Sequence, residues 1–271
     1  MNYSAIRQKA RQLISGNRKA FAPFILLTLI LNVSQLAPFL RRILTSASTG
    51  NFANPTLPVW LSLSTTIVSL IISACFLSLT LGLLSLFRKN KQGALAVSDA
   101  GLIFSRPFLG KAIKVALLQF VIYAVFYLIA LAGIFFYSIT ILGIASGAIT
   151  SEATVLINLI VILVLFITWF VLMVRYIYHF SMTYFILYDS ISQNSYTRAW
   201  DCLMESRAMM KGYKFRFFIL QLSFLGWYLL IPLTLGLASF YVIPYYQAAT
   251  AVFYETVKEG FSVLIVSDDE E

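Results

Sequence analysis

The sequence VALLQFVIYAVFYLIALAGIFFY, residues 115–137, decides the class of fold. It carries no charged side chain. About 20 apolar residues cross ~30 Å of hydrocarbon as one α-helix, so this stretch is long enough to do so. A second uncharged stretch, TVLINLIVILVLFITWFVLMV, follows at residues 154–174. Two such stretches in close succession predict a membrane-spanning pair of helices.

The composition of the whole chain agrees with this interpretation. Of its 271 residues, 60% are hydrophobic and 11% are charged, whereas a soluble domain is about half apolar and a quarter charged. The mean hydropathy is +0.85. A water-soluble globule of this composition would expose large apolar patches. A soluble enzyme and a disordered chain are therefore excluded, and we expect an all-α, multi-spanning membrane protein.

Four further apolar stretches bring the expected number of spans to six. The set runs Phe21–Leu40, Val59–Phe87, 115–137, 154–174, Phe217–Leu233 and Ala238–Val257. Thr234-Leu235-Gly236 after Pro232 predicts a tight turn between the last two. The basic start followed by the first apolar run also resembles a signal peptide, but that run is longer than a signal core.

The Lys and Arg residues are concentrated in the segments that lie on one side of the membrane. Of the 20 Lys and Arg residues, 17 lie in the amino-terminal segment, the link between spans two and three, the link between spans four and five, and the tail. Short cytoplasmic loops carry such an excess. Six spans therefore place both termini in the cytoplasm of a cell-membrane protein. A five-span count would place the tail outside.

The basic segments resemble one another, and each precedes two spans. We interpret the chain as one membrane domain built from three pseudo-repeats, about residues 1–92, 93–190 and 191–260, followed by an acidic cytoplasmic tail at 261–271. Each repeat would begin with an amphipathic helix. In the first, Tyr3, Ile6, Ala10, Leu13 and Ile14 share one helical face. This face could lie on the lipid surface or pack on the protein's own bundle. Asn194 or Ser195 is the expected cap of the third such helix.

The last third of the chain carries a pattern of short motifs. They are Glu205-Ser206-Arg207, Met209-Met210-Lys211-Gly212, Gly226-Trp227, Thr234-Leu235-Gly236, Pro244-Tyr245 and Phe253-Tyr254-Glu255. Over residues 196–255 the sequence resembles the bacterial integral-membrane family called domain of unknown function 975, which is found widely in Gram-positive bacteria. One departure is visible, because Gln193-Asn194-Ser195 stands where the family tends to have an Asp-Asn-Pro-like start. The resemblance implies a polytopic membrane protein and no established activity.

The sequence offers no catalytic set. It has one histidine, His179, two cysteines and no phosphate-binding loop. We therefore expect no enzyme activity, no cofactor and no metal. Nucleic-acid binding is also not expected, because no soluble domain remains to do it.

Three groups of residues are candidate sites. Basic side chains that could hold lipid phosphate or a membrane partner are Arg7, Arg11, Arg207, Lys211, Lys214 and Arg216. A polar cluster at the end of span four contains Arg175, His179 and Asp189; charge near a span favours a functional site, although Arg175 can also snorkel to the headgroups. A third group would kink helices or let them approach closely: Gly226, Trp227, Pro232, Gly236, Pro244 and Tyr245.

Two functions fit these features. The first is a non-enzymatic membrane protein that binds anionic lipid, or a membrane partner, through its basic cytoplasmic face. The alternative is a small transporter or lipid-handling permease whose path is lined by kinked helices five and six, with Gln119, Gln221 and Gln247. Uncharged polar residues in the spans, including Asn32, are equally explained by hydrogen bonds between helices.

The location of the tail tests the number of spans. In a chain that lacks Cys75 and Cys202, a Ser267→Cys variant should react with a membrane-impermeant maleimide only after the cells are permeabilised, since six spans return the tail to the cytoplasm. A Ser46→Cys variant, in the predicted external link, should react in intact cells. Labelling of Ser267→Cys in intact cells would support five spans instead.

Overall fold

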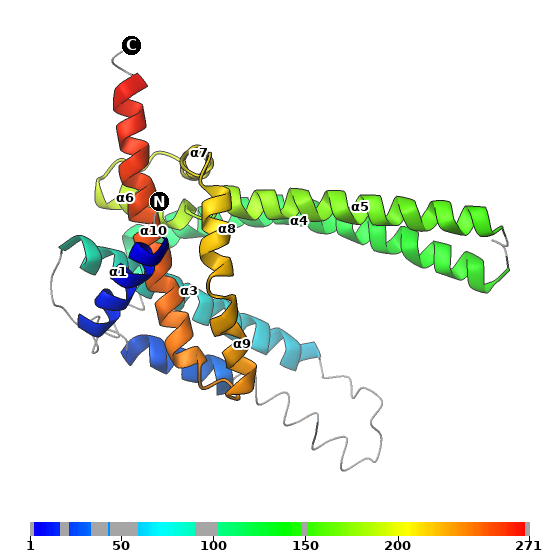
Figure 1. The fold of residues 1–271 in the computed structure, drawn as a ribbon, viewed down its shortest axis with the longest axis horizontal. Helices are drawn as coiled ribbons and strands as arrows, with labels where there is room; N and C mark the ends of the chain where they lie inside the picture. The colour runs from blue at the N-terminus through cyan, green and yellow to red at the C-terminus, as the bar shows by residue number, and fades with distance from the viewer. Residues whose placement is uncertain are drawn as a thin grey trace. The chain divides into compact units, whose positions relative to one another are not determined.

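The computed structural model describes residues 3–16, 22–33, 43, 59–89, 102–147 and 151–268. Every regular element in these ranges is helical (Figure 1), as the all-α class predicts. The chain separates into two compact units. Unit 1 consists of Met1–Leu109 and Phe215–Glu271, and unit 2 consists of Gly110–Lys214. Unit 2 is thus an insertion into the chain of unit 1.

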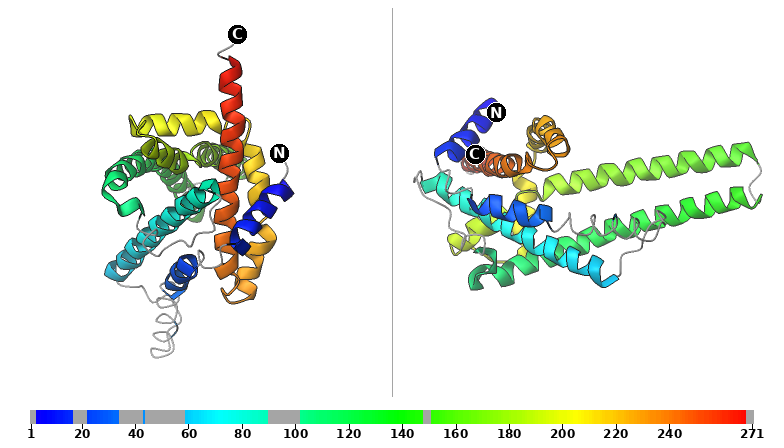
Figure 2. Two further views of the ribbon diagram at one scale, coloured as in Figure 1. Left: turned by 90° about the vertical axis from the view of Figure 1, so that its left-hand side faces the viewer. Right: turned by 90° about the horizontal axis from the view of Figure 1, so that it is seen from below.

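Unit 2 is dominated by a long helical hairpin. Helix α4 runs over Arg106–Ala145 and α5 over Glu152–His179. The two run alongside each other in Figure 1 and in the right-hand view of Figure 2. Pro107 stands in the first turn of α4, where its missing N–H costs no helical hydrogen bond. At the other end, Gly147 takes φ +72°, a left-handed conformation that glycine adopts without steric cost.

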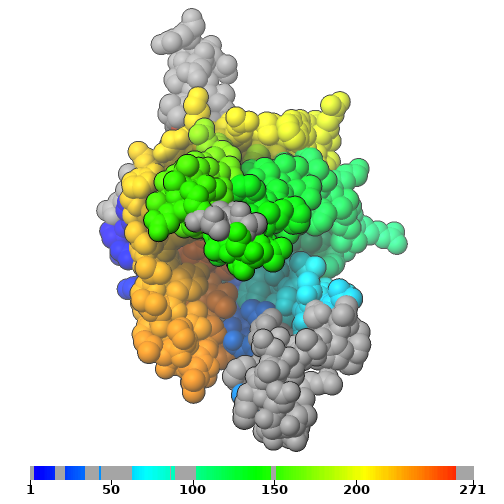
Figure 3. Space-filling model, turned by 90° about the vertical axis from the view of Figure 1, so that its right-hand side faces the viewer, coloured from blue at the N-terminus to red at the C-terminus, as the bar shows by residue number. Residues whose placement is uncertain are grey.

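The hairpin turns its apolar side chains outward. The buried residues of α4 are Ala112, Val115 and Thr140, and Tyr176 is the buried residue of α5. Leu142 keeps 69% of its surface exposed, and Figure 3 looks at the hairpin from its tip, with α4 and α5 seen end-on in green. Exposed aliphatic side chains at this density are unfavourable in water and favourable in lipid. The hairpin is therefore built for a hydrocarbon solvent.

The two short helices of unit 2 behave in the opposite way. Helix α6 runs over Thr183–Ser192 and α7 over Ala199–Met209, and they pack against each other. Their apolar side chains are inside: Phe185, Ile186, Leu187, Leu203 and Met209 are all buried. This pair therefore buries its apolar side chains inside the protein, unlike the hairpin. Helix α5 extends beyond the predicted end of span four at residue 174 and ends at His179.

The predicted cap of α7 is wrong. The N-cap residue is Arg198, which has extended backbone and makes no side-chain capping hydrogen bond. Asn194 instead lies in the preceding link with φ +55°, a conformation that asparagine tolerates better than most residues. The first turn of α7 is tied by the Thr197 hydroxyl, which donates to Asp201 Oδ2 at 2.6 Å.

Unit 1 is organised around α10, which runs over Ser239–Asp268. Three helices pack against it: α1 (Tyr3–Gly16), α3 (Val59–Lys89) and α9 (Leu225–Leu233). Tyr245, Phe253 and Tyr254 on α10 are fully buried. Helix α8 (Lys214–Leu222) contributes Phe217, whose ring centre lies 4.9 Å from that of Phe253. The amphipathic α1 buries Ile6 and Ala10. Of the two surfaces considered for its apolar face, the structure therefore selects the protein.

The structure supports part of the expected set of spans and does not show six spans or the pseudo-repeats. Among the described residues, four segments are long and apolar enough to cross a membrane: Leu63–Ser85, Arg106–Ala145, Glu152–Ser192 and Lys214–Leu233. The helix Ala22–Val33 is shorter, and the rest of the predicted first span lies outside the described residues. Helix α10 is not one of these apolar candidates, since its sequence includes Gln247, Glu255 and Lys258. The structure thus supports a helical protein with four candidate spans.

The predicted turn between α9 and α10 is confirmed. The amide of Gly236 donates to the Ile231 carbonyl at 2.8 Å, and the amide of Leu235 donates to the Pro232 carbonyl at 3.2 Å. These two bonds close α9 with a Schellman motif. The motif places Leu235 at φ +50° and Gly236 at φ +92°. Leucine is strained at the first of these positions, because its Cβ crowds the backbone there.

Replacing the strained leucine should stabilise the protein. Leu235 is 95% exposed, so Leu235→Gly removes strain with little loss of packing and should raise the free energy of unfolding by about 1 kcal/mol. Thermal unfolding in detergent would measure it. The matched control is Leu237→Gly in the same turn, at a residue without positive φ, which should be neutral or destabilising. A lower midpoint for Leu235→Gly than for Leu237→Gly would contradict the strain.

Candidate functional site

His179 lies at the end of α5 with both ring nitrogens engaged. Its Nδ1 is 2.8 Å from the carbonyl oxygen of Arg175, one turn earlier on the same helix. Its Nε2 is hydrogen-bonded to Nζ of Lys214. A carbonyl only accepts and an ammonium only donates. With Lys214 as an ammonium, Nδ1 carries the proton and Nε2 accepts, which corresponds to the neutral imidazole.

Three cations surround this imidazole. Arg175 comes from α5, Arg207 from the last turn of α7, and Lys214 from the first residue of α8. The positive charges of all three act on His179. The Ser206 hydroxyl donates to the His179 carbonyl at 3.0 Å and ties α7 to the end of α5. We call Arg175, His179, Arg207 and Lys214 the cation cluster.

The cation cluster lacks a carboxylate partner among the described residues. Neither arginine nor Lys214 makes an ion pair with a described Asp or Glu. Asp189, which the sequence grouped with Arg175 and His179, is buried on α6, where its backbone carbonyl accepts a bond from the Ser192 hydroxyl at 2.9 Å. The predicted set therefore divides. Gathered like charges repel, and a site that holds three of them is suited to an anion.

The predicted lipid-binding set is only partly brought together. Arg207 and Lys214 join the cation cluster, whereas Lys211 and Arg216 are exposed outside it. Arg7 and Arg11 lie on α1 of unit 1. Arg11 donates through Nε to the Tyr245 hydroxyl at 3.2 Å, and its guanidinium carbon lies 5.6 Å from the ring centre of Tyr245. A hydrogen bond and a cation–π contact thus hold α1 to α10.

The predicted kink and packing residues form part of an aromatic core. Trp227 lies 5.7 Å from Tyr241 and 6.2 Å from Tyr245, between ring centres. Pro232 stands near the end of α9 and Pro244 inside α10. Gly236 forms the turn. At Gly226 the described residues show no close approach, since none has a heavy atom within 4 Å of the Cβ position. The reason predicted for that glycine is not supported.

Polar side chains in unit 1 connect helices to one another. Gln221 donates to the Tyr246 hydroxyl at 2.8 Å, the Thr80 hydroxyl donates to Gln247 Oε1 at 3.0 Å, and Asn32 donates to the Ser239 hydroxyl at 3.1 Å. Two of the three glutamines proposed to line a transport path are therefore used in these interhelical bonds. For Gln119 the described residues offer no hydrogen-bond partner.

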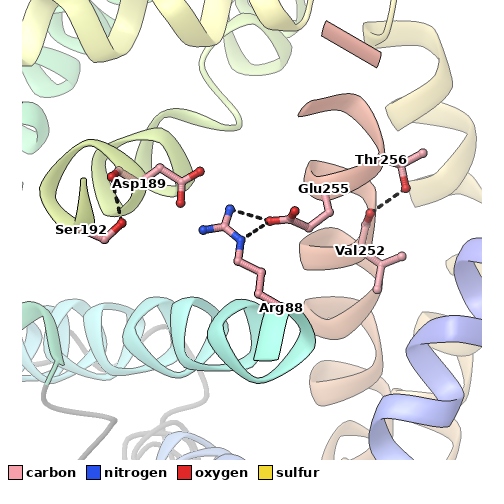
Figure 4. Close-up of polar contacts among 6 residues, drawn as sticks. All are labelled: Arg88, Asp189, Ser192, Val252, Glu255 and Thr256. Atoms are coloured by element: carbon pink, nitrogen blue, oxygen red, sulfur yellow. Dashed lines mark hydrogen bonds and ion pairs between the residues drawn. The ribbon is translucent and has the colours of Figure 1, made fainter. Parts of the chain in front are cut away.

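One ion pair in unit 1 is not indicated by any pattern in the sequence. Arg88 at the end of α3 reaches Glu255 on α10 (Figure 4), with Nε at 2.6 Å and Nη2 at 2.5 Å from the same carboxylate oxygen. The partners are 167 positions apart in the chain. No local spacing rule relates residues so distant, so only the packing of α3 on α10 could show the contact.

The chemistry of the buried thiol is that of a structural residue. Burial raises the pKa of Cys202, and the nearby Glu205 and Asp201 raise it further, while a hydrogen bond with Ser190 opposes the change. A thiol needs a lowered pKa to be a nucleophile at neutral pH. Burial also raises the pKa of Tyr196. Among the described residues no three potential metal ligands gather.

Comparison with known proteins gives the chain a family. The profile described as "Protein of unknown function (DUF975)" matches residues 1–260. The protein belongs to the DUF975 family. The match extends the resemblance seen at residues 196–255 to nearly the whole chain. No curated protein and no solved structure matches this DUF975 protein.

The Arg88–Glu255 pair should contribute measurably to the stability of the DUF975 protein. We expect a double-mutant cycle with Arg88→Gln and Glu255→Gln to give a coupling of about 1–2 kcal/mol in the free energy of unfolding, because the two side chains contact each other directly and either variant removes that contact. The control cycle pairs Arg88→Gln with Thr256→Val. Among the described residues, the Thr256 hydroxyl bonds only the Val252 carbonyl of its own helix (Figure 4). Equal coupling in the two cycles would contradict the ion pair's role.

Proposed function

We propose that this DUF975 protein is a non-enzymatic integral membrane protein that binds the phosphate of an anionic lipid through the cation cluster. The observation that carries the proposal is the convergence of Arg175, Arg207 and Lys214 on one neutral imidazole, with no carboxylate partner among the described residues. A phosphate would supply the missing negative charge and accept hydrogen bonds from both guanidinium groups.

The geometry around His179 favours binding over catalysis. Both ring nitrogens are occupied by hydrogen bonds, so the imidazole has no free lone pair with which to take a proton from a substrate. Its bond to Lys214 instead orients the ammonium group. Both arginine side chains are exposed, which leaves their N–H groups accessible to a headgroup. The role we assign to His179 is that of a positioning residue.

The proposal includes the finer topology expected from the sequence. Six spans in three pseudo-repeats would place both termini and the cation cluster on the cytoplasmic side of the cell membrane. This is the side on which 17 of the 20 basic residues are expected to lie. Anionic lipids give this leaflet its negative surface potential, which attracts basic protein surfaces. Charge complementarity therefore supports an anionic lipid as partner over a zwitterionic one.

The transporter alternative has less support. Its path would need polar side chains free to meet a substrate, whereas Gln221 and Gln247 each already bond another helix. Pro232 and Pro244 lie inside α9 and α10, where that alternative expects kinks, but α10 continues past Pro244 as one helix. A membrane protein is the second class of ligand considered for the basic face. Measurements of lipid binding would distinguish it from an anionic lipid.

Lipid binding by single-site variants tests the proposal. For the full-length protein in uncharged detergent, Arg175→Gln and Arg207→Gln should each weaken binding of phosphatidylglycerol about fivefold, because one cation near an anionic surface is worth about 1 kcal/mol. Native mass spectrometry at increasing lipid concentration measures the affinity. The control is Arg198→Gln, which removes the same charge from an exposed residue outside the cluster and should change the affinity less than twofold. Equal effects of all three, or equally tight binding of phosphatidylcholine, would refute the proposal.

A further inference from the structure

Contacts within the hairpin fix how α4 and α5 are aligned. The Tyr176 ring centre lies 5.2 Å from those of both Tyr123 and Phe126. Closer to the tip of the hairpin, the Trp169 indole on α5 donates to the Phe126 carbonyl on α4 at 3.0 Å. These contacts place Arg175, the neighbour of Tyr176, at the level of Tyr123 to within about one helical turn.

The charges of α5 set the position of the hydrocarbon on the hairpin. Between Glu152 and Arg175 the helix has no charged residue, and this stretch is about 35 Å long at 1.5 Å per residue. The hydrocarbon core is ~30 Å thick. The uncharged stretch is thus only slightly longer than the hydrocarbon core is thick, so Glu152 and Arg175 lie at its two boundaries. Through the alignment above, the inner boundary meets α4 near Tyr123.

This boundary differs from the one that the charges of α4 alone suggest. Its last basic residue is Lys114, nine residues before Tyr123, or about 14 Å along the helix. If the hydrocarbon began at Lys114, Arg175 and His179 would lie inside it. The same shift would push exposed apolar residues near the hairpin tip into water, among them Leu142, Leu156 and Ile157. Both consequences are unfavourable. With the boundary near Tyr123, Tyr137 lies in hydrocarbon. Burying its hydroxyl there costs less free energy than burying a charged arginine.

We propose that residues 115–122 of α4 form an apolar ledge in the headgroup layer of the cytoplasmic leaflet, and that the cation cluster lies at the depth of the lipid phosphates. The exposed side chains of this ledge are Leu117, Phe120 and Val121, with 58%, 67% and 58% of their surfaces accessible. Arg175 and His179 lie at the same level on α5. This inference rests on the proposed function and specifies the ligand, since a phosphate at this depth belongs to a membrane phospholipid and not to a soluble metabolite.

Tyrosines support the depth assigned to the ledge. Tyr123 and Tyr176 meet at the inner boundary, where the aromatic belts of membrane proteins lie. The Tyr176 hydroxyl is buried and has no hydrogen-bond partner among the described residues. A polar group of this kind is satisfied more readily at the wet headgroup level than in hydrocarbon.

Depth measurements on spin-labelled protein test the ledge. In full-length protein that carries Cys75→Ala and Cys202→Ala, reconstituted in phosphatidylglycerol–phosphatidylcholine vesicles, labels at Leu117→Cys and Ile177→Cys should be relaxed mainly by a water-soluble nickel chelate. Labels at Leu128→Cys and Val171→Cys, deeper on the same helices, should be relaxed mainly by oxygen. The result that would overturn the ledge is an oxygen-dominated label at both residues 117 and 177. This readout needs no lipid affinity, so it can fail while the proposed function stands.

Competition by soluble phosphate tests the source of the ligand. With phosphatidylglycerol bound to the wild-type protein, inorganic phosphate or glycerol phosphate at a hundredfold excess should displace less than a tenth of the lipid. Displacement in proportion to concentration would show that the cluster binds soluble anions equally well. That outcome would overturn the lipid assignment but would leave anion binding by Arg175 and Arg207 intact. If both arginine variants bind the lipid as tightly as the wild-type protein, the proposed function itself is rejected.

Discussion

The exposure of apolar side chains along α4 and α5 is the constraint on which the rest of unit 2 depends. Helices α4 and α5 have few buried residues, and the surface they expose is aliphatic and aromatic along nearly their full length. A hairpin of this kind would not be stable in water. Lipid removes that problem and makes a bare hairpin stable. It also imposes a length, since charges such as Arg175 must stay near the boundary of a layer ~30 Å thick. The position of the cation cluster follows from that length.

Unit 1 solves the opposite problem. Its central helix, α10, is not one of the apolar candidate spans, and it is surrounded by protein instead. Arg88–Glu255, Thr80–Gln247 and Asn32–Ser239 each join side chains of different helices. In a low-dielectric interior an unpaired polar group is costly, so such bonds are required wherever a polar helix is buried. Aromatic contacts around Tyr245 complete this core and hold Arg11 of α1 against it.

The cation cluster joins three segments that the chain keeps apart. His179 and Lys214 are 35 positions apart, and Arg207 comes from a separate helix. The α6–α7 pair provides the intervening chain, and its own buried core fixes where α7 ends. A turn with Gly212 at φ +84° then separates α7 from α8, which begins at Lys214. A pair of helices with its own buried core thus shapes a charged site at the end of a hairpin with exposed apolar side chains.

The sequence by itself determined the solvent of this protein, its all-α class and its family, because hydropathy and helix length act locally and need no knowledge of packing. It also identified Arg175, His179, Arg207 and Lys214 as residues of interest, and the turn at Gly236 from local turn chemistry. Only the tertiary structure separated Asp189 from that group, paired Arg88 with Glu255 and turned the apolar face of α1 toward α10. These outcomes depend on contacts between distant segments, and no periodicity or spacing along the chain encodes which distant segment will be the neighbour.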